Sequence, residues 1–404
     1  MSTAYATLAA PAPATLTAKY NPAIGYLRAF IVALVVAHHA ALAYHPYAPP
    51  PPASLLAQPR WWGAFPVIDP HKWGGSALLV GFNDQFFMSL MFFLSGLFVW
   101  RALSTKGVAT FLRDRFLRLG LPFVVAAGVL APLAYYPTYL QISGHAGGFW
   151  HQWLSLGNWP VGSAWFIAVL LAFDCIAALL FVLVPKQALK LGALTSGADR
   201  RPVIFFAALI AVSAVAYMPL AHHFTSLAWW SFGPFAFQTS RILHYLVYFL
   251  IGVAVGTRGL DRGLLSPQGK LARRWPLWLA TSLIFFVLAT AVTIAAMASW
   301  GKSPMLASAM DAGFVLSCAA SCFAFLAAFL RFAQSRSQVW DGLSANSYGI
   351  YLIHYAVVSW MQYALVPVAL PAVAKWLIVF PGALALSWAA ADAIRRIPAV
   401  ARVI

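Results

Sequence analysis

The sequence contains no glutamate, and charged residues of all kinds make up only 9% of its 404 residues. Soluble domains carry about 25% charged residues, so this composition excludes a water-soluble enzyme. Disordered chains are polar and poor in aromatic residues, whereas 62% of this chain is hydrophobic and 15% is aromatic. The composition therefore favours a protein embedded in a membrane.

Cysteine is also scarce. The three cysteines, Cys175, Cys318 and Cys322, all lie in apolar segments and are expected to be packing residues. Two thiols one helical turn apart are too few ligands for zinc, and the pair His222-His223 has no third ligand at a recognisable spacing. We therefore expect no metal site and no tightly bound cofactor.

Long apolar runs are abundant. A membrane-spanning helix needs about 20 mostly apolar residues, and ten segments meet this requirement: 24–45, 81–102, 116–137, 162–185, 203–220, 241–257, 275–298, 308–332, 346–367 and 373–393. We predict an all-α, polytopic fold of about ten transmembrane helices. They form a single membrane domain at 24–393, between a short tail at 1–23 and a second tail at 394–404.

The basic residues are unevenly distributed among the connections. With the N-terminus in the cytoplasm, 20 of the 26 Lys and Arg residues fall in inside segments and 5 fall outside, while Arg28 lies within the first span. Cytoplasmic loops carry an excess of Lys and Arg, so both termini are predicted to be cytoplasmic. The net charge of +17 is scattered rather than gathered in one patch, which argues against nucleic acid and favours membrane lipids as partners.

Aromatic residues gather in the outside connections 46–80 and 138–161. The first contains Trp61, Trp62, Phe65 and Trp73, and the second contains Trp150, Trp153 and Trp159. Such residues anchor a protein at the membrane interface, or they stack on the apolar faces of sugar rings, and both interpretations stay open.

The first span carries three ionisable side chains, Arg28, His38 and His39. Ionisable groups inside lipid are costly and are functional by default. Eleven residues separate Arg28 from His39, which is about 1100° of helical rotation, or three turns plus roughly 20°. The two side chains therefore lie on one helix face, about 16 Å apart along the axis. The plainer interpretation is an interfacial arginine and a hydrogen-bonded packing histidine.

The same span imitates a secretory signal with a cleavage site after Ala43. However, His38 and His39 stand where the apolar run would lead into the cleavage region. We therefore expect the span to be retained in the mature protein.

Two further segments near the cytoplasmic side carry groups suited to chemistry. In the second span, Ser95 and Gly96 allow another helix to approach closely, and the hydroxyl offers a donor. Arg113, Arg115 and Arg118 lie at the start of the third span. Their guanidinium groups suit phosphates bidentately, or they serve as ordinary cytoplasmic anchors.

Several groups lie deeper in the later spans. Tyr351 and His354 are three residues apart, on one face of a helix. Asp174 is expected to pair with a neighbouring helix or to line a cavity. Arg241 opens the sixth span on the outer side, where it either binds an anionic acceptor or anchors the chain at the interface. The pattern Gly252-x-x-x-Gly256 is typical of helix packing.

Taken together, these residues resemble the acyltransferase 3 family of integral membrane acyltransferases. The resemblance rests on the Arg-x10-His pattern, the Phe-Phe-Leu-Ser-Gly segment, an Arg-x-x-Arg pair, a Trp-Phe pair and a Ser-Tyr-x-x-Tyr-x-x-His segment. In this chain they are Arg28 and His39, Phe92 to Gly96, Arg115 and Arg118, Trp165 and Phe166, and Ser347 to His354. The paired His38-His39 looks most like the glucan biosynthesis protein C branch, which acylates periplasmic glucans. Many relatives have an Asp where this chain has Ser89, with Asp84 further upstream.

The resemblance implies a bacterial inner-membrane enzyme that moves an acetyl or succinyl group from cytoplasmic acyl-CoA to a hydroxyl of an extracytoplasmic glycan. In this interpretation His39 is a general base assisted by Arg28, and Arg113, Arg115 and Arg118 bind the donor phosphates. The cavity and the acceptor site would use His38, Ser95, Gly96, Trp165, Arg241, Tyr351 and His354. The rival interpretation is a secondary transporter or glycan flippase, although the first span has no counterpart in the second half, as internal repeats would require.

Overall fold

The computed structural model of the chain describes residues 22–145, 147–184, 192, 195–198, 200–299 and 302–403. The predicted tail at 1–23 therefore lies outside the described residues except for its last two. The same holds for Lys19, Lys186 and Lys190, which entered the prediction of orientation.

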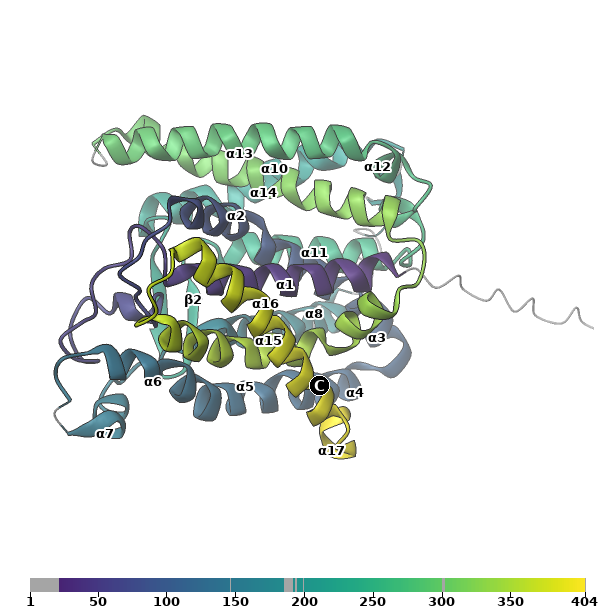
Figure 1. Ribbon diagram of the computed structural model, residues 1–404. Helices are drawn as coiled ribbons and strands as arrows, with labels where there is room; N and C mark the ends of the chain where they lie inside the picture. Colours follow the sequence, from purple (N-terminus) through teal and green to yellow (C-terminus); the bar gives the residue numbers. More distant parts are fainter. Residues whose placement is uncertain are drawn as a thin grey trace, which may run out of the picture.

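The described residues form helices joined by short connections, with one small hairpin of strands (Figure 1). The helices of the first half are α1 (Ala23–Leu42), α2 (Gly74–Gly96), α3 (Val99–Lys106), α4 (Val108–Arg115), α5 (Leu121–Val125), α6 (Ala131–Gln141), α7 (Gly148–Leu154) and α8 (Trp165–Leu183). Those of the second half are α10 (Pro202–Phe224), α11 (Ile242–Gly256), α12 (Lys270–Arg273), α13 (Trp275–Ala298), α14 (Pro304–Phe332), α15 (Gln338–Leu365), α16 (Ala372–Arg395) and α17 (Pro398–Ala401). The hairpin pairs β1 (Trp229–Phe232) with β2 (Phe235–Gln238) in antiparallel register.

The helices confirm the predicted polytopic, helical membrane fold. Among the described residues, eight helical segments are long and apolar enough to cross a membrane. The other two predicted spans correspond to α11, which has only 15 residues, and to α15, which has 28. Helix α15 buries Asn346, His354 and Gln362 inside the bundle, which is where polar groups of a membrane protein can find partners.

Several predicted boundaries differ from the observed ones. Helix α2 begins at Gly74 rather than near residue 81, and the hydroxyl of Ser76 in its first turn donates to the carbonyl oxygen of Trp73. The third predicted span is part of a longer helical run from Val108 to Gln141. Two π-helical turns, Phe116–Gly120 and Ala126–Leu130, join α4, α5 and α6 in that run.

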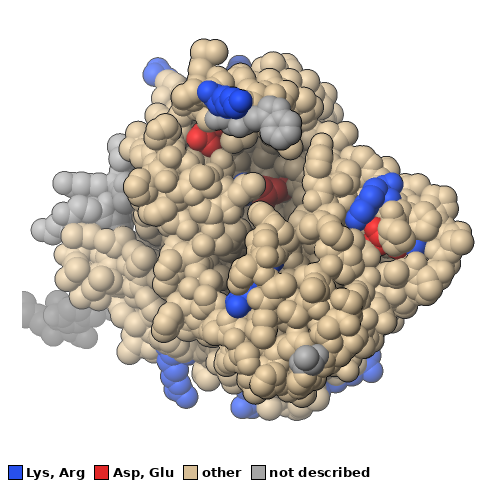
Figure 2. Space-filling view, turned by 90° about the vertical axis from the view of Figure 1, so that its left-hand side faces the viewer, with Lys and Arg blue, Asp and Glu red and all other residues tan. Residues whose placement is uncertain are grey.

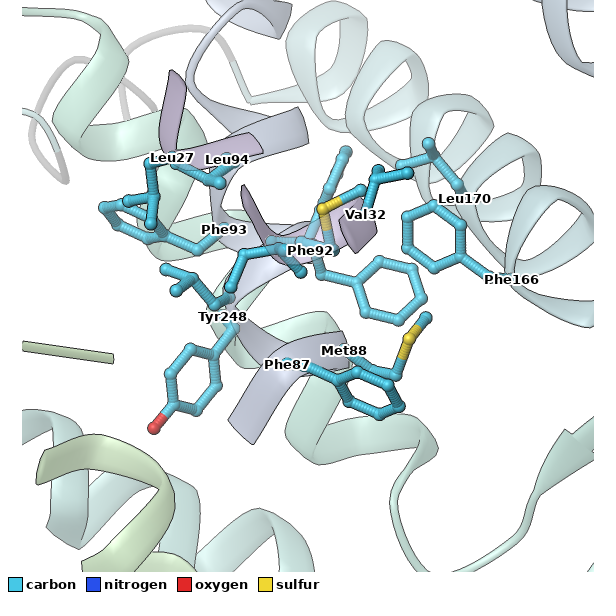
Figure 3. Packing of buried hydrophobic residues seen from close by; sticks show 14 of the residues in the cluster. Leu27, Val32, Phe87, Met88, Phe92, Phe93, Leu94, Phe166, Leu170 and Tyr248 are labelled. Carbon is cyan, nitrogen blue, oxygen red and sulfur yellow. The ribbon is translucent and has the colours of Figure 1, made fainter. Parts of the chain in front are cut away.

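Helix α1 lies at the centre of the bundle, packed against α2, α14, α15 and α16 (Figure 1). The core forms where α1, α2, α8 and α11 meet (Figure 3). There the ring centroids of Phe92 and Phe166 are 4.6 Å apart, and Leu27 and Val32 of α1 are buried beside them. The first helix is therefore surrounded by the elements that carry the other predicted site residues.

Three glycines bring α2 and α11 into backbone contact. A Cβ atom at Gly96 would lie 2.2 Å from the carbonyl oxygen of Phe249. A Cβ atom at Gly252 or Gly256 would lie 2.2 or 2.1 Å from a carbonyl oxygen of α2. These contacts confirm the packing role predicted for Gly252 and Gly256, since only glycine allows helices to approach this closely.

The two ends of the bundle differ. At one end, called here the arginine end, Arg28 of α1 and Arg395 of α16 donate hydrogen bonds to the carbonyl oxygens of Ser344 and Ala345. At the opposite end, called here the loop end, lie residues 43–73, α7 and the β1–β2 hairpin (Figure 1). The start of α1 and the end of α16 thus lie at the same end of the bundle.

The predicted aromatic loops are in part a folded core at the loop end. Trp62 and Trp153 are each only 2% exposed and pack around the ring of Tyr135. Both residues are therefore neither interfacial anchors nor accessible sugar-stacking groups. By contrast, Trp61 and Trp150 remain exposed, and either interpretation still applies to them.

A buried ion pair ties the loop-end segment down. Lys375 of α16 donates to Asp69 over 2.6 Å, and both side chains are almost completely buried. Asp69 also accepts from the backbone N–H of His71. Nearby, burial lowers the pKa of His45, and the charge of Lys72 lowers that pKa further.

Candidate functional site

The two histidines of the predicted motifs meet inside the bundle. His39 of α1 and His354 of α15 are 315 residues apart in sequence, yet Nδ1 of His39 lies 3.1 Å from Nε2 of His354. The register of α15 places Tyr351 one turn nearer the arginine end, and Tyr355 packs edge-on against the His39 ring at 4.8 Å. This contact joins the first and the last of the predicted motifs.

The hydrogen bonds determine which nitrogen of each ring carries the proton. Nδ1 of His354 lies 2.7 Å from the carbonyl oxygen of Tyr351, which only accepts, so this nitrogen donates and Nε2 of a neutral ring accepts. Nδ1 of His39 lies 2.9 Å from the carbonyl oxygen of Val35 and faces Nε2 of His354. This Nδ1 must therefore donate, and Nε2 of a neutral His39 is left with a free lone pair.

The loop end is hollowed, and His38 and His39 are partly exposed. Figure 2 looks onto the loop end and shows a hollow at its centre with an acidic side chain inside. His38 and His39 are both only partly buried, although they lie within a membrane-spanning helix. The ring of His38 packs against Phe87 of α2 at 5.1 Å. The rings of His38 and His39 are therefore not fully enclosed by other side chains, whereas His354 is completely buried.

A short segment outside the long helices reaches the same depth as the histidines. The hydroxyl of Tyr351 donates to the carbonyl oxygen of Ser163, in the short helical turn Gly162–Ala164 that precedes α8. Gly162 has a φ of +53°, and a Cβ atom there would lie 2.6 Å from the ring of Tyr355. Irregular backbone at membrane depth is tolerated where it is buried in protein or lines a cavity.

At the arginine end there is a second accessible space, a cavity of about 360 Å³. Its walls carry Arg28, Arg115, Arg118 and Lys106, together with Ser95. The hydroxyl of Ser95 donates to the carbonyl oxygen of Met91. Four cations around one cavity suit a polyanionic ligand. The structure thus brings together Arg28, Arg115 and Arg118, three of the five arginines in the predicted site.

The cavity also contains carboxylates that neutralise part of this charge. Asp174 is 1% exposed, and its Oδ2 lies 3.2 Å from Nε of Arg115. Lys106 pairs with Asp114 over 2.6 Å. Asp174 thus both pairs with a neighbouring helix and lines the cavity, as the two interpretations of this residue expected.

The remaining predicted residues occupy different places. Arg113 is exposed and does not line the cavity. Trp165 begins α8 and packs edge-on against Trp229 of the hairpin at 5.5 Å. Phe166 and Tyr351, whose ring centroids are 5.7 Å apart, lie in the layer between the arginine cavity and the histidine pair.

Sequence reasoning missed the partner of Arg241. This side chain is almost completely buried and donates to Oδ2 of Asp84 over 2.7 Å. It also donates to the backbone carbonyl oxygen of Asp84, and its guanidinium lies 4.4 Å from the centroid of the Phe314 ring. Arg241 therefore joins α11 to α2 and α14, and simple anchoring at the interface does not describe it. The unusual run Asn83-Asp84-Gln85 within an apolar helix was the available signal.

Comparison with known proteins gives the family. Residues 21–392 match the acyltransferase 3 family, which is described as an acyltransferase domain. Searches of the curated proteins and of the solved structures found no match. Since the matched region spans nearly the whole chain, this protein belongs to the acyltransferase 3 family and is a multi-pass membrane acyltransferase.

Proposed function

We propose that this acyltransferase moves an acetyl or succinyl group from cytoplasmic acyl-CoA, bound at the arginine end, to a hydroxyl of an extracytoplasmic glycan at the loop end. The observation that carries the proposal is the His39–His354 contact. This pair lies between a cation-lined cavity at one end and a hollow at the other. We expect the thioester to approach His39 from the arginine end and the acceptor to approach it from the loop end.

The excess of basic residues supports the orientation in this proposal. The arginine end would face the cytoplasm of a bacterium, with both termini on that side. Arg28, Arg115 and Arg118 would hold the phosphates of the nucleotide. The thioester arm would then extend toward His39, which lies about 16 Å further along α1 from Arg28.

The proposed chemistry is direct transfer. Nε2 of His39 takes the proton of the sugar hydroxyl while its oxygen attacks the thioester carbonyl carbon. The carbon–sulfur bond breaks, the coenzyme thiolate leaves, and the proton on Nε2 passes to the sulfur. His354 accepts a hydrogen bond from Nδ1–H of His39 throughout, and so holds the ring in the tautomer and orientation that this step requires.

The test uses purified protein in sealed vesicles with acyl-CoA labelled in its acyl group on one side and a neutral glucan oligosaccharide on the other. We expect label to appear in the oligosaccharide as an ester, and parallel assays with acetyl- and succinyl-CoA identify the donor. Oligosaccharide that crosses the membrane without label would instead support a transporter or flippase. Vesicles without protein are the control for spontaneous transfer.

A first prediction concerns the arginine cavity. Arg118→Gln is expected to raise the donor KM about tenfold, because a charge-assisted hydrogen bond to phosphate is worth about 1.5–3 kcal/mol. Arg115→Gln is combined with Asp174→Asn, so that no buried carboxylate loses its partner. The double variant should raise the donor KM as well. Initial rates at varied acyl-CoA concentration give the donor KM of both variants.

Arg101→Gln is the matched control, because Arg101 is an exposed arginine of α3 that does not line the cavity. Its donor KM should equal that of the wild type. An unchanged donor KM in the Arg118 and Arg115/Asp174 variants would return these arginines to the role of membrane anchors.

A further inference from the structure

Helix α2 carries three consecutive polar residues, Asn83, Asp84 and Gln85, in the middle of an apolar span. Polar groups inside a membrane are costly and mark functional sites. Asn83 donates to the carbonyl oxygen of Leu34 of α1, which ties this turn of α2 to the helix that carries the histidines. The proposed mechanism uses none of the three residues.

The charges at this turn are arranged unevenly. The side chain of Arg241 is only 5% exposed, whereas that of Asp84 is 43% exposed. The guanidinium thus lies behind the carboxylate, with Phe314 on its face. Only Oδ2 of Asp84 accepts from Arg241, so the other carboxylate oxygen keeps its capacity to accept hydrogen bonds.

This pair adjoins the histidines on the side of the loop end. Asp84 lies one helical turn from Phe87, whose ring packs on His38. The direction from Phe87 to Asp84 along α2 leads toward the loop end, because α2 begins there at Gly74.

The residues on either side of Asp84 along α2, and His38 of α1, carry polar atoms without partners. Among the described residues, Oδ1 of Asn83, Oε1 of Gln85 and Nδ1 of His38 are buried and have no hydrogen-bond partner. A buried polar atom left unpaired costs about 1–3 kcal/mol. Because α2 turns about 100° per residue, Asn83 and Gln85 leave the helix in directions about 160° apart, and the partly exposed Asp84 is the group of this turn that an acceptor can reach.

We infer that Asp84, held by Arg241, forms the subsite that binds the hydroxyl groups of an uncharged, polyhydroxylated acceptor. This inference rests on the proposed function and adds the acceptor class. Arg241 holds the Asp84 carboxylate in place as a positioning residue. Because Asp84 neutralises Arg241, the subsite has no spare cation, which disfavours the anionic acceptor that Arg241 alone would suggest.

The test compares Asp84→Asn with the wild type, using a neutral glucan oligosaccharide and the same oligosaccharide carrying uronic acid carboxylates. We expect the acceptor KM for the neutral sugar to rise about tenfold, as expected for the loss of a charged hydrogen-bond acceptor. The donor KM should not change. The anionic sugar should bind to Asp84→Asn more tightly than to the wild type, because the substitution leaves Arg241 without its counter-charge.

Two further variants keep the result interpretable. The double variant Asp84→Asn/Arg241→Gln removes both charges, so it leaves no unpaired buried cation. It should bind the neutral sugar more weakly than the wild type does, without binding the anionic sugar more tightly. Asp261→Asn, at an exposed residue near η6 (Gly263–Leu265), is the control and should match the wild type. The thermal unfolding midpoint of each purified variant in detergent shows whether it is folded.

Equilibrium binding of the neutral oligosaccharide in the absence of acyl-CoA separates this inference from the proposed function. Suppose that the wild type binds the neutral oligosaccharide, that Asp84→Asn binds it more weakly, and that neither protein transfers an acyl group. This result would support the subsite and overturn the transferase proposal. Acyl transfer with an unchanged acceptor KM in folded Asp84→Asn protein would overturn the subsite. In that case the Asp84–Arg241 pair would serve only to join α2 and α11.

Discussion

Replacing His39 by alanine is expected to lower kcat for acyl transfer by about 10²- to 10⁴-fold, the usual contribution of a positioned general base. The substitution removes the lone pair of Nε2, which the hydrogen bonds of Nδ1 to Val35 and His354 leave available. It also removes the ring that packs against Tyr355. The rate of label transfer to the glycan, at saturating donor and acceptor, measures this effect directly.

The matched control is His151→Ala, because His151 is an exposed histidine of α7 at the loop end. The kcat of that variant for acyl transfer should equal that of the wild type. Binding of acyl-CoA at the arginine cavity should survive in His39→Ala, since the cavity walls do not include His39. Wild-type kcat in a folded His39→Ala protein would remove His39 from the mechanism.

The second large effect on kcat is expected when His354 is replaced by phenylalanine. Phenylalanine keeps an aromatic ring among the buried side chains of α15 but removes the acceptor nitrogen that faces Nδ1–H of His39. The His39 ring then loses the group that fixes its tautomer, and kcat should fall by about 10²-fold. Donor and acceptor KM values should stay near those of the wild type, because His354 touches neither proposed substrate.

A rescue variant distinguishes orientation from packing. His354→Gln places an amide oxygen within this region, and that oxygen can accept from Nδ1–H of His39. We expect it to recover part of the activity that His354→Phe loses. Equal losses in both variants, accompanied by equal drops in the unfolding midpoint, would mean that His354 serves packing alone.

The sequence was sufficient to predict the helical membrane fold, because a spanning helix is a local property of about 20 residues. The common helix face of Arg28 and His39 also follows from local geometry. In contrast, the end of α2 nearest the loops was not predicted. Gly74 and Gly75 are typical of a loop, yet both belong to the first turn of α2.

The contacts that build the candidate site are long-range, which is why the sequence did not predict them. His39 and His354 were each singled out by their own motifs, but nothing local specifies that they meet across 315 positions. Arg241 and Asp84 are separated by 157 positions. Likewise, the hairpin of β1 and β2 depends on contacts such as that of Trp229 with Trp165, so the all-helical prediction omitted it.

The glycine contacts between α2 and α11 have a mechanical consequence. Because Gly96 and Gly252 place no side chain between the two backbones, α2 and α11 are in direct contact. Sliding one helix along the other would bring backbone atoms into a steric clash, so we expect the two helices to move as one unit. Asp84 lies on α2 and Arg241 directly precedes α11, so this backbone contact also holds their ion pair in a fixed arrangement. We expect any motion that admits or releases a bulky substrate to involve elements other than α2 and α11.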